Sequence, residues 1–201
     1  MKKQVHFVWL EGVLEEAAAR KILACTGFDV EGAVFKVAGS NSTFWQRIKD
    51  RNASAEAGLV VVGFADLEQD PCAVGLIRKH LPHGVAPGFV LRIAVRMLES
   101  WLMADAEKMA AFLHAPISKL PANPDEIDHP KRELVNLARR HSNRRVQEDM
   151  VPEAGHTGIV GKGYRTQMEN YIEKHWRPRA AAKRSESLRR ALAALENLAR
   201  S

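Results

Sequence analysis

The stretch that decides the fold is LVVVGF, residues 59–64, an unbroken apolar run followed closely by acids. A short run of this kind, rich in β-branched residues and containing one glycine, predicts a strand that is covered on both faces, as in parallel sheets. Asp66 lies just beyond the run, and Glu68 follows two residues later in ADLEQDPC, residues 65–72. We therefore expect a buried central strand with carboxylates at its carboxyl end.

Outward from this run, strand-like and helix-like segments alternate along the chain. The same reasoning predicts helices wherever apolar residues recur at helical spacing, with Gly27 as the cap of the first helix. This alternation predicts an α/β fold with a mostly parallel sheet flanked by helices. The expected strands are residues 5–10, 33–37, 59–64 and 88–94, and the expected helices are residues 14–26, a segment around 44–48, 73–81 and 96–113.

The composition changes after residue 115. Residues 116–130 contain four prolines together with acidic and amide side chains, which predicts a loop or excursion. Beyond this segment the apolar spacing is helical as far as the end of the chain. We therefore divide the chain into an α/β core, residues 1–115, and a helical, basic C-terminal region, residues 116–201, that packs on the core.

Several protein classes are disfavoured by composition. With 201 residues and 46% apolar content the chain can bury a sizeable core. No apolar run reaches the roughly 18 residues of a membrane span, and the N-terminus lacks the apolar core of a signal peptide. Cys25 and Cys72 are the only two cysteines, and neither they nor the histidines show metal-ligand spacing. We expect a cytoplasmic protein without a membrane partner, a disulfide framework or a zinc site.

The net charge of +6 is unevenly distributed. Residues 1–129 carry 14 basic and 16 acidic side chains, whereas residues 130–201 carry 16 basic and 8 acidic ones, a difference of +8. A basic region beside a near-neutral one is typical of proteins that approach phosphate, although a solvated basic helical surface has the same composition.

The acids gather at predicted strand ends. Glu11 follows the first expected strand, Glu15 lies four residues later, and Asp66 with Glu68 follows the central strand. Ligands of open parallel sheets bind at the carboxyl edge, where loops and helix N-termini converge. Carboxylate oxygens are the ligands that Mg²⁺ or Mn²⁺ prefers, so the pattern predicts a metal site at this edge.

Taken together, these motifs resemble the TOPRIM domain of topoisomerases, primases and overcoming-lysogenization-defect nucleases. TOPRIM domains have a glutamate after the first strand and an Asp-x-Asp pair after a later one; here WLEGVLEE, residues 9–16, and VVVGFADLEQDPC, residues 60–72, stand in that order. More closely, the chain is similar to a bacterial TOPRIM-like family of unknown function whose members are often encoded beside ABC-type ATPases in anti-phage loci. The matching segments are FADLEQDPCAVGL (64–76), RIAVRMLESWLMAD (92–105) and GKGYRTQMENYIEKHWRPRAAAKRSESLRRAL (161–192).

The resemblance implies roles for three acids. Glu11 would be the TOPRIM glutamate, a general base or metal ligand, and Asp66 the first metal-binding acid. Glu68 replaces the usual second aspartate, which moves its carboxylate outward by about one methylene. Glu15 is a further candidate metal ligand because of its position four residues after Glu11, and not because of the resemblance.

RIAVRMLESWLMAD predicts a helix on which Arg92, Arg96 and Glu99 share one face, at spacings of four and three. One interpretation is an internal Arg96–Glu99 ion pair that fixes packing. The other places Glu99, with Asp105, beside the acidic cluster as a metal ligand, and directs Arg92 or Arg96 to a phosphate.

GHTGIVGKGYRT, residues 155–166, fails the Walker A pattern because His156 and Gly163 replace the required glycine and hydroxyl residue. We interpret it as a loop that presents Lys162 and Arg165 to a nucleic-acid backbone, the alternative being an ordinary connector. Lys183 and Arg184 in the basic C-terminal region are further candidates for nucleic-acid contact.

The sequence thus predicts a Mg²⁺-dependent or Mn²⁺-dependent TOPRIM-type nuclease that acts in phage defence or DNA processing with a partner ATPase, with Glu11, Asp66 and Glu68 as catalytic residues. Two alternatives stay open: a catalytically degenerate binding or sensor subunit of an ABC-type ATPase complex, and a stand-alone nucleic-acid-binding protein with structural carboxylates. The chain could form a homo-oligomer under each of these three interpretations.

The basic C-terminal region generates a first prediction. Because every phosphate contact releases counterions, affinity for nucleic acid should fall at least tenfold between about 50 and 200 mM salt. Fluorescence anisotropy with a labelled oligonucleotide measures this dependence. An affinity that does not change with salt would contradict a phosphate-contacting surface.

Overall fold

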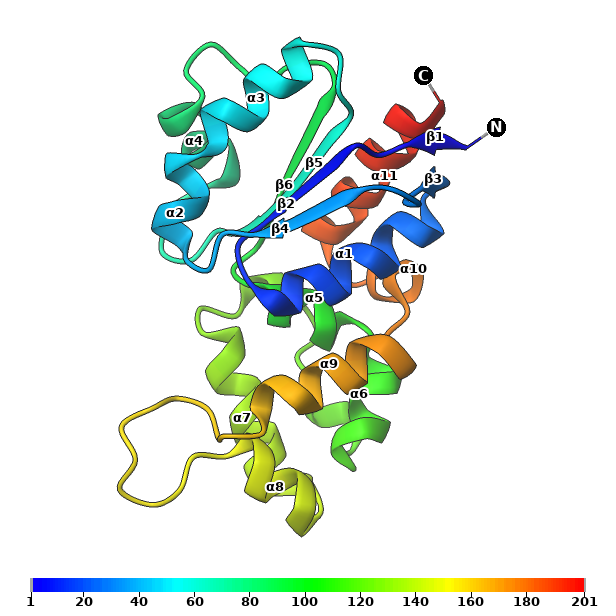
Figure 1. Cartoon of the computed structure of the whole chain (residues 1–201). Helices are drawn as coiled ribbons and strands as arrows, with labels where there is room; N and C mark the ends of the chain where they lie inside the picture. Colours follow the sequence, from blue (N-terminus) through cyan, green and yellow to red (C-terminus); the bar gives the residue numbers. More distant parts are fainter. Residues whose placement is uncertain (1, 201) are drawn as a thin grey trace.

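The computed structural model describes residues 2–200, and at its centre lies a four-stranded parallel sheet (Figure 1). A second pair of short parallel strands, β1 (Lys3–Gln4) and β3 (Phe28–Asp29), lies at the start of β2. The predicted α/β architecture with a parallel sheet is therefore confirmed. In spatial order the four strands of the central sheet are β4 (Val34–Val37), β2 (Phe7–Leu10), β5 (Val61–Asp66) and β6 (Phe89–Ala94).

Both faces of the sheet are covered because side chains alternate along each strand. Trp9 packs on one face with Phe44 and Trp45, while Val8 and Leu10 join the core on the other. Figure 1 shows these two layers on opposite sides of the strands. The first layer consists of α2 (Asn41–Gln46), α3 (Ile48–Glu56) and α4 (Ala73–His80), and the second includes α1 (Val13–Cys25) and α11 (Glu186–Arg200).

The order of the strands creates a switch point between β2 and β5. From β2 the chain crosses through α1 to β4 on one side, and then returns through α2 and α3 to β5 on the other side of β2. In open parallel sheets the loops at such a point diverge to opposite faces and leave a crevice at the carboxyl edge. Glu11 and Asp66 stand at the two strand ends that border it.

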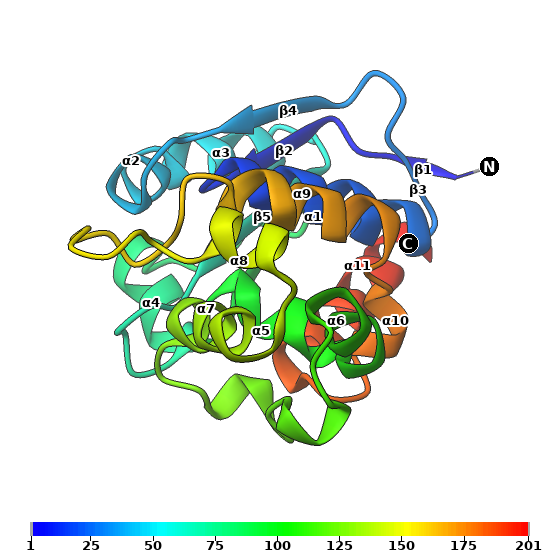
Figure 2. The ribbon, with the colours of Figure 1, turned by 90° about the horizontal axis from the view of Figure 1, so that it is seen from below.

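A helical layer closes the structure below the carboxyl edge of the sheet (Figures 1 and 2). Its apolar residues belong to the same core as the strands: Leu10, Trp101, Leu134, Tyr171 and Leu188 form one cluster that runs across the predicted boundary at 115/116. No helix within residues 2–200 is long and apolar enough to cross a membrane. The elements of this part are α5 (Leu98–Ala104), α6 (Ala106–Leu113), the 3-10 turns Ile117–Lys119 and Pro124–Glu126, α7 (Pro130–His141), α8 (Arg144–Met150), α9 (Tyr164–Lys174) and α10 (Pro178–Ala181).

The predicted single helix over residues 96–113 is wrong, because the chain breaks into α5 and α6 at Asp105. The buried carboxylate of Asp105 accepts hydrogen bonds from the backbone N–H of Arg177 and from its guanidinium, at 2.7–3.0 Å. These long-range contacts hold Asp105 at φ −80°, ψ 69°, outside the helical region. Local spacing does not reveal this partner, which lies 72 residues away along the chain.

The predicted alignment of Arg92, Arg96 and Glu99 on one helix face is also wrong. Arg92 lies in β6, Arg96 in the turn that follows it, and only Glu99 in a helix, α5. The Arg96 guanidinium donates to the carbonyls of Glu68 and Asp70, so it ties down the loop after β5 and does not pair with Glu99.

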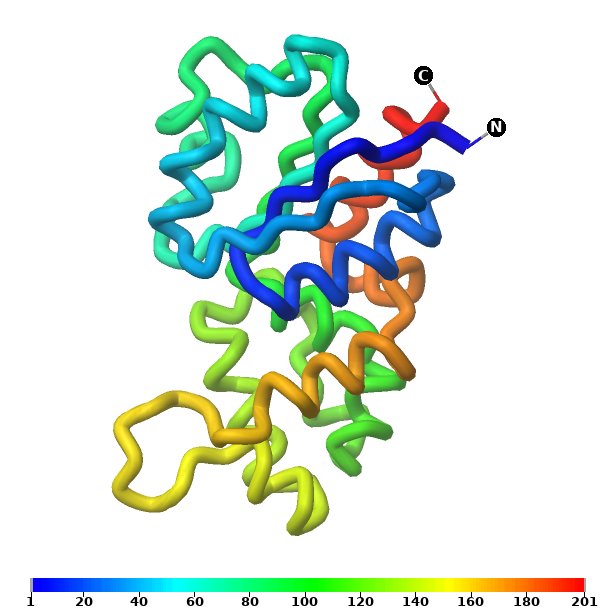
Figure 3. Tube along the Cα trace, in the orientation of Figure 1, coloured from blue at the N-terminus to red at the C-terminus, as the bar shows by residue number. Residues whose placement is uncertain are grey.

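The segment from residue 151 to 163, between α8 and α9, projects from the body of the molecule (Figure 3). Its base is fixed at Gly161, whose N–H donates to the carbonyl of Met150 at 2.9 Å. A Cβ at Gly161 would lie 2.4 Å from the Asp149 carbonyl oxygen, so this close approach requires glycine.

Trp101 joins the sheet to the helical layer and generates a prediction. Its ring meets Phe64 edge-on at 5.9 Å, its Nε1–H donates to Ser187 Oγ at 2.7 Å, and the residue is 1% exposed. Trp101→Ala should lower the free energy of unfolding by about 3–5 kcal/mol, measured by urea denaturation.

The matched control is Val74→Ala, at a site that is 58% exposed, which should change the free energy of unfolding by less than about 0.5 kcal/mol. Equal, small effects for both substitutions would show that Trp101 does not couple the two parts.

Candidate metal centre

A cavity of about 320 Å³ opens at the carboxyl ends of β2 and β5. Five acids line it: Glu11, Glu15, Asp66, Glu68 and Glu99. They come from the end of β2, the first turn of α1, the end of β5, the loop after it and the first turn of α5. The structure therefore brings the five predicted metal-ligating residues to one place.

Glu11 and Asp66 are linked directly. The backbone N–H of Asp66 donates to Glu11 Oε2 at 3.4 Å, and Asn41 Nδ2 donates to the same oxygen at 3.1 Å. Asp66 Oδ1 accepts from the backbone N–H of Leu98 at 2.9 Å. Both carboxylates are thus oriented by donors, and one oxygen of each takes part in none of these bonds.

Glu15 reaches the cavity by folding back over the start of α1. A Cβ at position 12 would lie 2.6 Å from Glu15 Oε2, so Gly12 leaves the room that the carboxylate occupies. A negative charge at this helix start is stabilised by the exposed N–H groups of the first turn. Glu16, the next residue, points elsewhere and pairs with Arg20 at 2.7 Å.

Glu99 is buried, with 2% exposure, between two residues of the helical layer. Tyr164 OH donates to Glu99 Oε1 at 2.8 Å, and Lys131 Nζ lies 3.5 Å from the same oxygen. Lys131 is the second residue of α7, and Tyr164 is the first residue of α9. The C-terminal region therefore completes the cavity.

Burial and repulsion by neighbouring charges raise the pKa values of three of the acids, Glu11, Glu15 and Asp66. Desolvation raises the pKa of Asp66 well above its usual value, and the charges of Glu15, Glu99 and Glu11 add to the effect. Desolvation, with the charges of Glu99 and Glu11, raises the pKa of Glu15 to about 7. The pKa of Glu11 is raised mainly by burial and further by Glu68, against the lowering effect of the Asp66 and Asn41 hydrogen bonds.

Lys131 is the counter-charge of this cluster. Desolvation alone would lower the pKa of Lys131, but the charges of Glu99, Asp66 and Glu15 outweigh it and raise the pKa. Burial and the neighbouring Glu99 raise the pKa of Tyr164, which stays a neutral hydrogen-bond donor. One ammonium group cannot balance four ionised carboxylates, so the ionisation of all four together is unfavourable.

Glu68 differs from the other acids because it is exposed and stands at the mouth of the cavity. Its backbone is left-handed, with φ 51°, and its N–H donates to the Arg96 carbonyl at 2.9 Å. Its charge still reaches Glu11, whose pKa it raises.

Of the predicted basic residues, the structure brings only Arg165 to this cavity. Lys162 pairs with Glu153 on the projecting segment at 2.9 Å, and Arg92 lies in β6 with its Nε buried and unbonded within residues 2–200. Arg184 donates to the carbonyls of Pro121 and Ala122, and Lys183 lines a separate surface groove. The expectation for Asp105 is wrong, since it pairs with Arg177 away from the cavity.

The donor chemistry fits a hard divalent cation. No three or more Asp, Glu, His or Cys side chains among residues 2–200 form a ready-made ligand group. However, Mg²⁺ usually keeps several waters and binds through one or two carboxylates plus substrate phosphate, so a closed protein cage is not required. Glu11 and Asp66, held side by side with oxygens to spare, are the residues suited to such binding.

Sequence reasoning missed Lys131, Tyr164 and the contact from Asn41. Asn41 stands in the turn-forming segment 39–42, and Lys131 is one of 30 basic residues with no motif around it. Because Lys131 and Tyr164 come from helices beyond residue 115, only the packing of those helices on the sheet edge reveals them.

Comparisons with protein-family models, with curated proteins and with solved structures found no match to this chain. The TOPRIM resemblance therefore stays a prediction that rests on the quoted motifs.

Glu15 generates a prediction about pH. Its pKa rises from 4.5 to about 7 on folding, so the folded state binds this proton more tightly than the unfolded chain. The contribution of Glu15 to the free energy of unfolding is fully present below the pKa of the unfolded chain, 4.5, and it is lost as the pH rises through the pKa of the folded state, about 7. In EDTA, the free energy of unfolding should fall by on the order of 1–3 kcal/mol between about pH 5 and pH 8.

Glu15→Gln should reduce this pH dependence and make the protein more stable than wild type at the higher pH, whereas Glu16→Gln should leave the dependence intact. Urea denaturation at several pH values measures both variants. The same slope in Glu15→Gln and wild type would contradict the assignment.

Proposed function

We propose that the chain is a divalent-metal-dependent nuclease of TOPRIM type that hydrolyses phosphodiesters in the cytoplasm. The observation that carries the proposal is the meeting of Glu11 and Asp66 at the switch point of the sheet, where the Asp66 N–H donates to Glu11 Oε2. The order of these acids in the sequence is the order that the TOPRIM pattern requires.

Mg²⁺ or Mn²⁺ would be held by Glu11 and Asp66, with Glu15 and Glu68 within the same cavity. When bound, such an ion neutralises charge on a phosphodiester and makes water more acidic. Glu11, whose pKa is raised by burial, is suited to accept a proton from water near neutral pH. Asp66 is kept in place by the Leu98 N–H.

The basic groups at the cavity would position the substrate. Arg165 stands on the rim with a side chain that is 68% exposed, and Lys131 faces the acids with 35% exposure. Both line the cavity and can contact a phosphate that enters it, and such contacts favour the charged transition state of hydrolysis.

A second candidate function is a non-catalytic subunit, and Lys131 is the observation that favours it. Its ammonium group lies 3.5 Å from Glu99 and near Asp66 and Glu15, so it can supply part of the positive charge that a metal ion would otherwise provide. In that case the domain would serve as a binding or sensor module for nucleic acid or for an ABC-type ATPase. The ATPase partner and the role in phage defence are proposed from the family resemblance alone.

Cleavage of nucleic acid tests the first proposal. Purified protein should cleave single- or double-stranded DNA or RNA with Mg²⁺ or Mn²⁺ and not in EDTA. Glu11→Gln and Asp66→Asn should each reduce the rate by at least about 100-fold, because they remove a base or ligand.

Glu16→Gln is the matched control, since it removes the same charge one residue from Glu15 and should leave the rate within about twofold. Circular dichroism checks that each variant is folded. Cleavage by Glu11→Gln at the wild-type rate would rule out hydrolysis at the carboxylate cavity through Glu11, and absence of cleavage by the wild-type protein with retained nucleic-acid binding would favour the non-catalytic module.

A further inference from the structure

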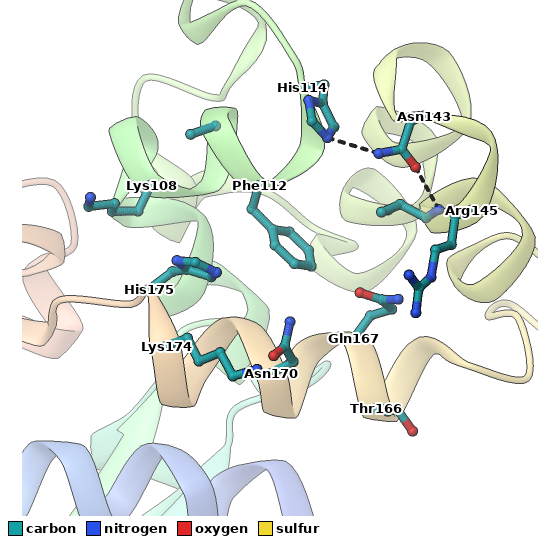
Figure 4. Close-up of a pocket in the computed structure, with 12 residues that line it drawn as sticks. Lys108, Phe112, His114, Asn143, Arg145, Thr166, Gln167, Asn170, Lys174 and His175 are labelled. Carbon is teal, nitrogen blue, oxygen red and sulfur yellow. Dashed lines mark hydrogen bonds between the residues drawn. The ribbon is translucent and has the colours of Figure 1, made fainter.

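A second, larger cavity of about 650 Å³ lies away from the carboxylates, between α6, α8 and α9 (Figure 4). It shares no lining residue with the carboxylate cavity. Helix α9 contributes to both cavities: Tyr164 and Arg165 line the carboxylate cavity, and Thr166, Gln167, Asn170 and Lys174 line this one.

The charge of this cavity is entirely positive. Lys108, Arg145 and Lys174 line it from three different helices, and none of the twelve lining residues in the described chain is acidic. Within residues 2–200 the side chains of these three cations have no hydrogen bond or ion pair. By contrast, Arg144, the neighbour of Arg145, pairs with Glu148 at 2.7 Å. Unpaired cations around a concave surface attract an anion.

An aromatic ring forms part of the cavity wall between the cations. The Phe112 ring projects from α6 toward α9 (Figure 4). It contacts the Tyr171 ring, with ring centroids 5.1 Å apart, and the ring of His175, another lining residue, at 6.2 Å. A ring supported in this way, with one side on a cavity, is a surface on which a nucleobase can stack.

Amide groups supply the remaining polar contacts. Gln167 Nε2 donates to Asp149 at 2.6 Å, which orients the amide, and the Asn170 side chain has no partner within residues 2–200. Amides that can both donate and accept are suited to the edge of a base.

We propose that this cavity binds a nucleoside phosphate, with the base against Phe112 and phosphate on the cations that flank the ring, Lys108 and Lys174 on one side and Arg145 on the other. A free nucleotide and a nucleotide unit of a single strand share this chemistry. The inference does not depend on hydrolysis at the carboxylate cavity, so each can fail without the other.

The test is equilibrium binding of a short labelled oligothymidylate, followed by fluorescence anisotropy in EDTA so that no cleavage occurs. The triple variant Lys108→Gln, Arg145→Gln, Lys174→Gln should weaken binding at least about tenfold, because three charge-assisted contacts are lost. Phe112→Leu, which keeps every charge, should weaken it at least about fivefold through lost stacking.

The matched control is the triple variant Lys36→Gln, Lys49→Gln, Arg78→Gln, which removes the same charge from exposed positions on β4, α3 and α4. It should change affinity by less than about threefold. Equal losses in the two triple variants, or no loss in Phe112→Leu, would overturn the proposal.

Competition separates the two sources of the ligand. Displacement of the oligonucleotide by adenosine monophosphate, but not by inorganic phosphate at the same concentration, identifies a free nucleotide as sufficient. Displacement only by unlabelled oligonucleotide identifies the nucleotide unit of a strand. Displacement by inorganic phosphate as effective as that by adenosine monophosphate would show that the base is not recognised, and would overturn the proposal.

Discussion

The repulsion between carboxylates at the sheet edge is the constraint on which the rest of the site depends. Glu11, Glu15, Asp66 and Glu99 face one cavity with a single ammonium group, Lys131, among them. Removing charges of the same sign from water and placing them together is unfavourable unless donors or cations compensate. The fold supplies donors, namely the N–H groups of Asp66 and Leu98, the amide of Asn41 and the hydroxyl of Tyr164. One ammonium group does not balance the charges of the ionised acids, which is why the pKa values of Glu11, Glu15 and Asp66 are raised and why a divalent cation suits the cavity.

This constraint also explains why the helical region belongs to the site. The sheet alone brings together Glu11 and Asp66, but the groups that compensate Glu99 come from α7 and α9. These helices pack through Leu134, Met168 and Tyr171 into the same core as the strands. A protein cut at residue 115 would therefore lose Lys131 and Tyr164, and with them the partners of Glu99. Residues of α9 line both the carboxylate cavity and the basic cavity, in a region whose sequence is strongly basic.

The sequence predicted those features that follow from strand topology. Acids at the ends of parallel strands share one edge whatever their separation along the chain, so the meeting of Glu11 with Asp66 could be inferred from the order of apolar runs. Features that depend on the packing of helices could not be inferred from the sequence in this way. The break at Asp105 is set by Arg177, and Arg96 turns to the carbonyls after β5, because each finds a partner that local periodicity does not encode. Lys131 and Phe112 carry no motif, and only their positions in space give them a place in a cavity.

The most direct measurement is the anomalous diffraction of crystals soaked with Mn²⁺ near neutral pH. The account predicts an anomalous peak in the carboxylate cavity, within coordination distance of Glu11 and Asp66 oxygens, that disappears in Asp66→Asn crystals. Crystals of comparable quality with no peak there, and with the Lys131 ammonium group still facing Glu99, would contradict the claim that these acids share a divalent cation.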